Sequence, residues 1–285
     1  MNIQWYPGHM TKTRRMMEED LKLVDAVCEI LDARIPISSR NPDIDAICGK
    51  KPRMVILNRI DMADADLVSR WSNYFKDRGM AVIRTDCKSR KGINTFAPAV
   101  RQLLSEKLQR YAEKGQVGRP LKLMIVGIPN VGKSTFINQI AGRKGAKAEN
   151  RPGVTRGKQW VNVDGGLLLL DTPGILWPKF DDPEVGMRLA YTGAVKDDIL
   201  DTETLGCHLM ELLAREYPGA LTERYKIEIP AEIDGWELLQ AAGRKRGFLV
   251  PGGEVDTERM ARVLLEEYRS CKLGTFTLER PEELA

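Results

Sequence analysis

The chain has 285 residues, 42% of them hydrophobic and 29% charged, with a net charge of +4, as is typical of a globular protein. No apolar run approaches the ~20 residues of a membrane span, and charged residues interrupt the first twenty positions, which argues against a signal peptide. The five cysteines are scattered without a CxxC pair and histidine occurs twice, so we expect a cytoplasmic protein without a zinc site or disulfide framework.

The first part of the chain alternates predicted helices with predicted strands. Short apolar runs rich in β-branched residues predict strands, and a 3.6-residue period predicts helices. In chain order we expect a helix at 12–23, strands at 26–31 and 54–57, a helix at 65–77, a strand at 81–84 and a helix at 93–113. A linker-like GQVGRP sequence follows at 115–120.

Two of these strands end in motifs that suit a guanine base. Asn58-Arg59-Ile60-Asp61 follows the second strand and fits the NKxD pattern with arginine in place of lysine. Its aspartate would accept hydrogen bonds from the guanine N1–H and amino group, which adenine cannot donate in that arrangement. The arginine can stack on the base as the aliphatic stem of lysine does.

The third strand is followed by a sequence that is similar to the SAK motif. Here Asp86 stands for the serine and Cys87 for the alanine, and Lys88 matches the lysine. In that motif a backbone amide contacts the guanine O6. We therefore predict that Asp86 and Cys87 complete the guanine site.

A strand at 121–126 is followed by GIPNVGKS, a GxxxxGK[ST] phosphate-binding loop, and then by a helix at 134–141. Glycines allow the backbone to wrap around phosphate, Lys133 would neutralise the β- and γ-phosphates, and Ser134 would bind Mg²⁺. The helix N-terminus would add its dipole. The residues predicted to contact phosphate here are Asn130, Val131, Gly132, Lys133, Ser134 and Thr135.

Strands are also predicted at 159–163 and 167–170, and the second leads into Asp171-Thr-Pro-Gly174. At this distance from a phosphate-binding loop, DxxG predicts an aspartate that reaches Mg²⁺ through water and a glycine amide that senses the γ-phosphate. Thr155, in the polar loop between the two motifs, is the expected second hydroxyl ligand of Mg²⁺ and a catalytic candidate.

The sequence changes character after residues 173–183, which contain three prolines. Helical periods are predicted at 187–196, 204–217, 235–244 and 256–271. We therefore expect an α/β domain over residues 1–177, with a mostly parallel six-stranded sheet and helices on both faces, and a small all-helical domain over 178–285.

The guanine motifs precede the phosphate motifs, which reverses the order found in Ras-like proteins. Permutation of this kind leaves neighbouring strands in place because it cuts one surface loop and joins the old termini, here at 115–120. The chain resembles the YlqF/YawG group of circularly permuted GTPases, through QWYPGHM at 4–10 and Asp32-Ala-Arg-Ile-Pro36. The resemblance implies GTP hydrolysis coupled to a late step of assembly of the large ribosomal subunit.

The position that orients the attacking water in Ras-like enzymes is Ile175 here, which has no hydrogen-bonding side chain. His9, within the family signature, is the candidate catalytic group, although a lone histidine is often structural. In similar GTPases an asparagine at the place of Asn130 helps to hold K⁺. The alternative is an asparagine that only satisfies the loop backbone.

Charge is distributed unevenly along the chain. Residues 178–285 carry 14 basic and 22 acidic residues, a balance of −8, so that residues 1–177 carry +12. A basic domain suits ribosomal RNA, and the candidate contacts are Lys12, Arg14, Arg15, Arg244, Lys245 and Arg246. The last three could instead complement a helix dipole.

Two readings of the function stay open at this level. The first is a monomeric GTPase that binds the precursor of the large subunit and its rRNA, with Mg²⁺ and a candidate K⁺ as cofactors and no membrane partner. The second is a GTP-gated switch that binds a protein or another RNA and uses hydrolysis only for release. Because DxxG leads directly into the helical domain, a γ-phosphate-dependent shift could reorient that domain in either case.

Overall fold

The computed structural model describes residues 10–145, 159–163, 165–172, 182–195 and 201–284. The chain folds into two compact units. One contains Gln4–Asp181 together with Thr277–Ala285, and the other contains Asp182–Phe276. The domain boundary predicted from the sequence, at 177/178, puts the last nine residues in the second domain. In the structure they belong to the first, because their contacts are with residues of the sheet domain.

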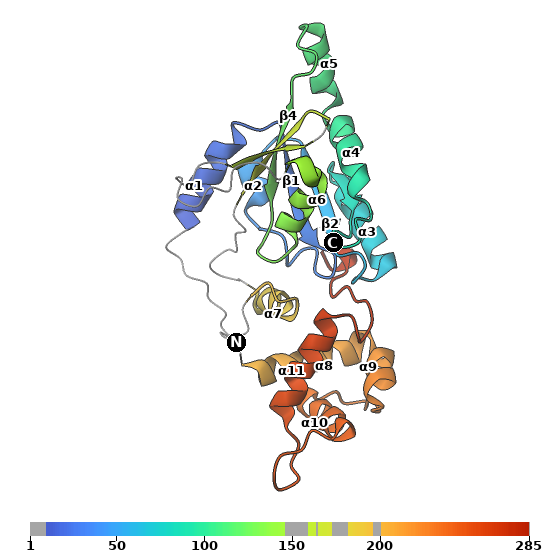
Figure 1. Ribbon diagram of the computed structural model, residues 1–285. Helices are drawn as coiled ribbons and strands as arrows, with labels where there is room; N and C mark the ends of the chain where they lie inside the picture. Colours follow the sequence, from blue (N-terminus) through green and yellow to red (C-terminus); the bar gives the residue numbers. More distant parts are fainter. Residues whose placement is uncertain (1–9, 146–158, 164, 173–181, 196–200, 285) are drawn as a thin grey trace. The chain divides into compact units, whose positions relative to one another are not determined.

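A six-stranded sheet forms the centre of the first unit, as expected, and follows the order β3-β2-β1-β4-β6-β5 (Figure 1). All neighbouring strands are parallel except β5 and β6, which are antiparallel. The strands with the guanine motifs, β2 and β3, therefore precede β4, the strand of the phosphate loop, in the chain, and β1 lies between β2 and β4 in the sheet. The strands are β1 Ala26–Asp32, β2 Arg53–Asn58, β3 Ala81–Arg84, β4 Leu121–Val126, β5 Gln159–Val163 and β6 Leu167–Asp171.

Helices cover both faces of the sheet (Figure 1). Val27 of β1 packs with α1 and α2, and Leu31 of the same strand packs with α3. Because side chains alternate along a strand, these two residues point to the same face, so the three helices lie on one side. Helices α4 and α6 cover the other side, where Phe96 and Phe136 meet edge to face at 5.2 Å. The bounds are α1 Met10–Leu21, α2 Ile44–Cys48, α3 Ala65–Asp77, α4 Phe96–Leu103 and α6 Lys133–Gly145.

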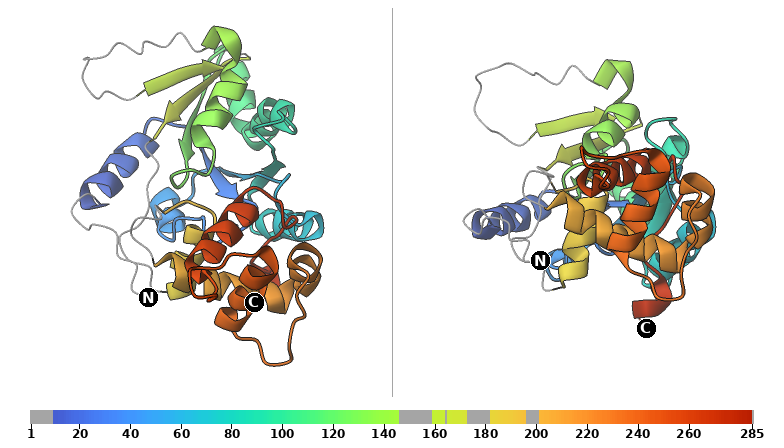
Figure 2. Two further views of the ribbon diagram at one scale, coloured as in Figure 1. Left: turned by 60° about the horizontal axis from the view of Figure 1, so that its bottom comes forward. Right: turned by 90° about the horizontal axis from the view of Figure 1, so that it is seen from below.

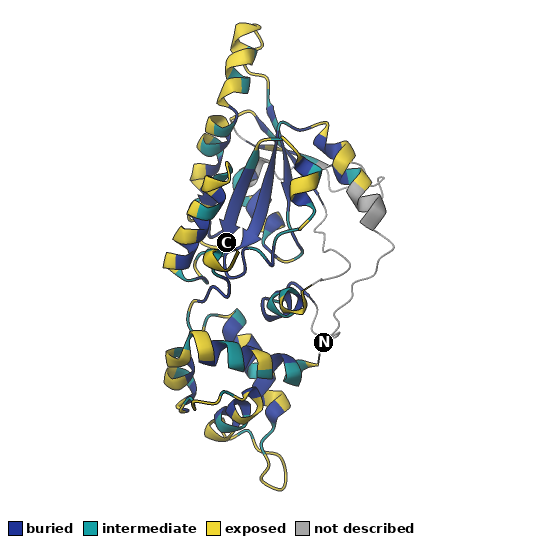
Figure 3. Cartoon of the chain, turned by 180° about the vertical axis from the view of Figure 1, so that it is seen from behind, coloured by how far each residue is buried: buried dark blue, intermediate teal, exposed yellow. Residues whose placement is uncertain are grey.

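The helix expected at 93–113 is interrupted. It consists of the 3₁₀ turn Ile93–Thr95, α4 and α5, which spans Ser105–Glu113. The break falls at Leu104, which is buried and has φ −107° and ψ 22°. Helix α4 packs on the sheet, whereas α5 has no buried residue, as its exposed surface in Figure 3 makes clear.

The second unit is all-helical, as expected. Aspartates cap four of its helices: Asp182, Asp201, Asp234 and Asp256 each accept a hydrogen bond from a backbone amide of the first turn. The helix α9 is not among those predicted from the 3.6-residue period. Residues 247–256 form a loop that extends from the helices (Figure 2). The helices are α7 Pro183–Tyr191, α8 Thr202–Glu216, α9 Pro218–Tyr225, α10 Gly235–Arg246 and α11 Thr257–Arg269.

None of the helices in the described ranges has the length and apolar character that crossing a membrane requires.

Candidate nucleotide-binding site

Two adjoining pockets lie at the carboxyl ends of the parallel strands, where α/β proteins commonly bind ligands. One, of ≈ 580 Å³, is lined by the phosphate loop and includes Asn130, Lys133 and Ser134. The other, of ≈ 290 Å³, is lined by the two guanine motifs and includes Asp61 and Cys87. Arg59, Gly132 and Thr135 line both. The sheet thus brings together motifs that the chain separates by about 70 residues.

The phosphate loop contains a position that only glycine can occupy without backbone strain and a steric clash. Gly132 has φ +100°, and a Cβ there would lie 2.4 Å from Nδ2 of Asn58. Asn58 approaches this closely because its Nδ2 donates to the Val131 carbonyl at 2.9 Å. Glycine at position 132 is therefore required by the packing of two loops as well as by the ligand.

Lys133 connects the phosphate loop with the DxxG strand. Its Nζ lies 3.0 Å from Oδ1 of Asp171 at the end of β6 and also donates to the Thr172 carbonyl. Thr172 in turn donates through Oγ1 to the Ile125 carbonyl of β4 at 2.7 Å. The ammonium group is thus held, largely buried, beside the phosphate pocket.

The residues expected to hold Mg²⁺ have suitable chemistry. Ser134 is exposed on the first turn of α6, and Asp171 presents a partly exposed carboxylate. A hydroxyl and a carboxylate are hard oxygen ligands, and Mg²⁺ is usually bound by one or two such groups together with substrate phosphates. Within the described ranges, no cluster of three or more His, Cys, Asp or Glu residues could form a dedicated metal site.

Asn58 links the two halves of the site. Its Oδ1 accepts hydrogen bonds from Oγ1 of Thr85 at 3.1 Å and from the amide of Cys87 at 3.2 Å, while its amide group donates to the phosphate loop. The side chain is buried, so each of these bonds is shielded from water. The amide expected to reach the guanine O6 is therefore already bonded to Asn58.

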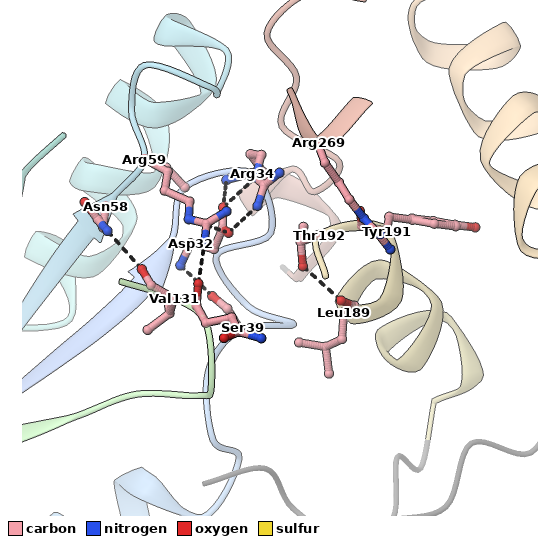
Figure 4. Close-up of polar contacts among 12 residues, drawn as sticks. Asp32, Arg34, Ser39, Asn58, Arg59, Val131, Leu189, Tyr191, Thr192 and Arg269 are labelled. Carbon is pink, nitrogen blue, oxygen red and sulfur yellow. Dashed lines mark hydrogen bonds and ion pairs between the residues drawn. The ribbon is translucent and has the colours of Figure 1, made fainter. Parts of the chain in front are cut away.

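Arg59 lies between two acceptors (Figure 4). Its Nη2 donates to the Asn130 carbonyl at 2.5 Å, and its Nε lies 3.7 Å from Oδ2 of Asp32. Asp32 also accepts two hydrogen bonds from the Arg34 guanidinium, at 2.9 and 2.7 Å. Burial acts to raise the pKa of Asp32, but the charges of Arg34 and Arg59 outweigh it and hold that pKa below its usual range.

The two aspartates of the guanine pocket differ in environment. Burial, followed by repulsion from Asp86, raises the pKa of Asp61. Burial acts in the same direction on Asp86, but hydrogen bonds from Ser89 and Lys88 prevail and lower its pKa. Asp86 accepts from the Lys88 amide at 2.8 Å and so stabilises its own turn. The carboxylate of Asp61 is the one suited to new donors from a ligand.

Comparison with known proteins identifies the family. The model of a family described as 50S ribosome-binding GTPase matches residues 122–217. Ribosome biogenesis GTPase A of Priestia megaterium is 48% identical over 99% of this chain and 98% of its own length. This chain belongs to the family of ribosome biogenesis GTPase A. It is a circularly permuted GTPase.

More distant relatives match nearly the whole chain. Mitochondrial ribosome-associated GTPase 1 of Mus musculus is 33% identical over 97% of this chain and 90% of its own length. The GDP-bound structure of YlqF from T. maritima superposes with a TM-score of 0.69 at 27% identity, covering 94% of this chain and all of that one. The permuted order read from the motifs agrees with this likeness.

Several residues singled out from the sequence cannot be placed. His9, Thr155 and Gly174 lie outside the described residues, as does Ile175. Of the three basic candidates near the N-terminus, Lys12 and Arg14 lie on α1 and Arg15 is exposed there. Their roles stay predictions for this member of the family.

The basic cluster at the end of α10 divides in two. Arg244 and Lys245 are exposed. Arg246 lies 5.3 Å from the ring centroid of Tyr225 and 3.4 Å from Oε1 of Glu267, so part of its charge is already used within the helical unit. These contacts make Arg244 and Lys245 the more available cations for an external anion.

Sequence reasoning assigned no role to Asp32. The signal was present, because Asp32-Ala-Arg ends a strand adjacent to the one that ends in NRID. The register, which pairs Asp32 with Asn58, becomes known only from the sheet.

Proposed function

We propose that this protein hydrolyses GTP while bound to the precursor of the large ribosomal subunit and couples hydrolysis to a late assembly step. The observation that carries the proposal is the joining of a phosphate pocket and a guanine pocket by Asn58 and Arg59, in a chain 48% identical to a ribosome biogenesis GTPase A. The 50S ribosome-binding description of the matching family model supports the choice of the large subunit.

In the proposed site, Asp61 binds the guanine edge and Lys133 binds the β- and γ-phosphates. Ser134 and Asp171, with Thr155, would hold Mg²⁺, which stabilises the charge that develops on the phosphates. Lys133 must exchange its contact with Asp171 for the phosphates when GTP binds. That exchange releases the carboxylate for the metal shell, so nucleotide and Mg²⁺ are expected to bind cooperatively.

The proposal is tested by measuring GTP turnover with purified large subunits, small subunits and neither. We expect slow turnover by the protein alone and stimulation by large subunits. Stimulation by small subunits only would contradict the proposal. If the protein binds a protein partner or another RNA instead, neither subunit will stimulate it, and the protein is expected to sediment as a free monomer.

We also propose that Asn130 helps to hold K⁺ at the phosphates, where the ion would offset the charge of the transferring phosphoryl group. Asn130 lies in the phosphate pocket with φ +61°, a conformation that asparagine tolerates better than most residues. We expect faster turnover in KCl than in NaCl at equal ionic strength. Equal rates would mean that Asn130 serves only the backbone of the loop.

A further inference from the structure

The C-terminal segment Thr277–Glu279 is bound to the loop that follows β1. Oγ1 of Thr277 donates to the Ala33 carbonyl at 3.0 Å, and the amide of Leu278 donates to the Arg34 carbonyl at 2.7 Å. The Glu279 carboxylate accepts hydrogen bonds from the amides of Ile37 and Ser38, at 2.6 and 2.9 Å. These residues are about 240 positions apart in the sequence.

Glu279 is itself fixed in place. It is buried, with 4% of its surface exposed, and the Ser38 hydroxyl also donates to it. Its backbone carbonyl accepts a hydrogen bond from Nε1 of Trp71 on α3 at 3.0 Å. A buried carboxylate bonded to two successive amides holds the conformation of that backbone far more tightly than water would, because charge-assisted bonds are the strong ones.

The loop that Glu279 holds contains Asp32 and Arg34. The Asp32 amide donates to Oγ of Ser39 at 3.0 Å, next to the two amides that Glu279 binds. The carboxylate of Asp32 lies between Arg34 and Arg59 (Figure 4). The position of this carboxylate therefore depends on a loop closed from one side by Ser39 and from the other by the C-terminal segment.

Arg59 carries the effect to the nucleotide site. Its guanidinium contacts Asp32 with one nitrogen and the Asn130 carbonyl with another, and it lines both pockets. Lysine would offer a single nitrogen at this position, whereas the planar fork of arginine can contact both acceptors at once. Arginine in place of the usual lysine thus fits the presence of Asp32.

We propose that Glu279 is a positioning residue for guanine-nucleotide binding, acting through the loop at 32–40 on Asp32 and, through it, on Arg59. The inference rests on the proposed nucleotide site. It gives the C-terminal segment Thr277–Glu279, which follows the helical unit in the chain, a role in retaining the nucleotide.

The test measures the rate at which a fluorescent GDP analogue leaves the full-length protein. Glu279→Gln keeps the size of the side chain but removes its charge. It also places the NH₂ group of glutamine where one carboxylate oxygen accepted a hydrogen bond from a backbone amide. We expect release to be about tenfold faster, within the range typical of coupling between sites. Glu282→Gln is the matched control, since Glu282 lies nearby and forms an exposed ion pair with Arg70. Its release rate should equal that of the wild type.

A purely structural role for Glu279 is tested with two further variants. Trp71→Phe removes the hydrogen bond to the Glu279 carbonyl and leaves the carboxylate. If the increase in release rate is proportional to the loss of unfolding temperature in both Trp71→Phe and Glu279→Gln, the effect is one of stability alone and the inference is overturned. If Glu279→Gln does not fold, Ser38→Ala removes only the hydroxyl donor to the carboxylate. It should still speed release, and an unchanged rate would overturn the proposal.

Coupling to Asp32 is tested with a double variant. Asp32→Asn alone should also speed release, and adding Glu279→Gln should increase the rate little further, because both act through Arg59. If the increases in release rate caused by the two substitutions multiply in the double variant, the proposed route through Arg59 is contradicted. Absence of guanine-nucleotide binding by the wild type would instead refute the proposed function, which keeps the two failures distinct.

Discussion

Asp61 and Asp86 line the same pocket but have opposite pKa shifts. The donors of the Asp86 turn satisfy its carboxylate, whereas the carboxylate of Asp61 lies beside a second negative charge. Hydrogen-bond donors on a guanine edge would stabilise the charged form of the Asp61 carboxylate. We therefore expect nucleotide specificity at this site to depend on the Asp61 carboxylate, which is the acceptor that the NRID motif predicts.

We predict that Asp61→Asn changes the preferred nucleotide. An amide has one acceptor and one donor, so it cannot bind both guanine donors but can match the C2 carbonyl of xanthine. Affinity for GTP should fall by about 100-fold or more, and xanthosine triphosphate should become the better ligand. Competition with a fluorescent nucleotide measures both.

Asp86→Asn is the control for that substitution. Asparagine keeps the acceptor for the Lys88 amide, so the turn and GTP affinity should change little. A similar loss of GTP affinity in both variants would mean that the turn, and not the Asp61 carboxylate, determines guanine recognition.

At the scale of elements, the helical unit depends on a close approach between α8 and α11. A Cβ added at Gly206 would lie 2.4 Å from Cβ and 2.9 Å from Cα of Ala261. The second of these is a backbone atom, so one helix would have to move. The packing of these two helices therefore requires glycine at a position where helix propensity favours alanine.

We predict that Gly206→Ala lowers the free energy of unfolding of the helical unit by about 1–3 kcal/mol, as overpacking typically does. Gly219 is a matched control, because nothing lies within 4 Å of its added Cβ. Gly219→Ala should be neutral or slightly stabilising. Urea denaturation of the two variants measures the difference, and equal stabilities would contradict the predicted overlap.

The strands expected from the sequence agree with the structure to within a residue at each end, and the helix expected at 65–77 has the same bounds as α3. Periodicity identifies such elements because each buries one regular face. It missed α2 and α9, which are too short for a period to emerge, and it merged α4 with α5. That break depends on where the sheet beneath the helix ends, which is not a local property.

At the scale of the whole molecule, each unit contains a buried carboxylate whose pKa is lowered by the arginines beside it. In the sheet unit it is Asp32, and in the helical unit it is Glu267, which accepts from Arg224 at 3.0 Å and from the Tyr225 hydroxyl at 2.8 Å. Burial acts to raise the pKa of Glu267, but the bonds from Arg224 and Tyr225 prevail and lower it.

We predict that both units lose stability in acid. A carboxylate whose pKa is lower in the folded state stabilises the fold above its unfolded pKa, and this contribution is lost as the pH falls through the folded value. Stability should therefore decline below about pH 4–5. Asp32→Asn and Glu267→Gln should each be less stable at pH 7 but show a shallower decline, measured by thermal unfolding at several pH values. If the stability of these variants falls with pH as steeply as that of the wild type, the two carboxylates are not the cause of the loss of stability in acid.

The strands, most of the helices, the phosphate loop and the permuted order of the motifs can be predicted from the sequence. These are local features, because a repeat of 2 or 3.6 residues and a glycine-rich turn can be recognised within a short window. That Asp32 faces Arg59 and that Glu279 holds the loop containing Asp32 becomes known only from the three-dimensional structure. Such contacts depend on strand register and on the return of the C-terminal segment to the sheet domain, and no pattern along the chain encodes which distant residues will meet.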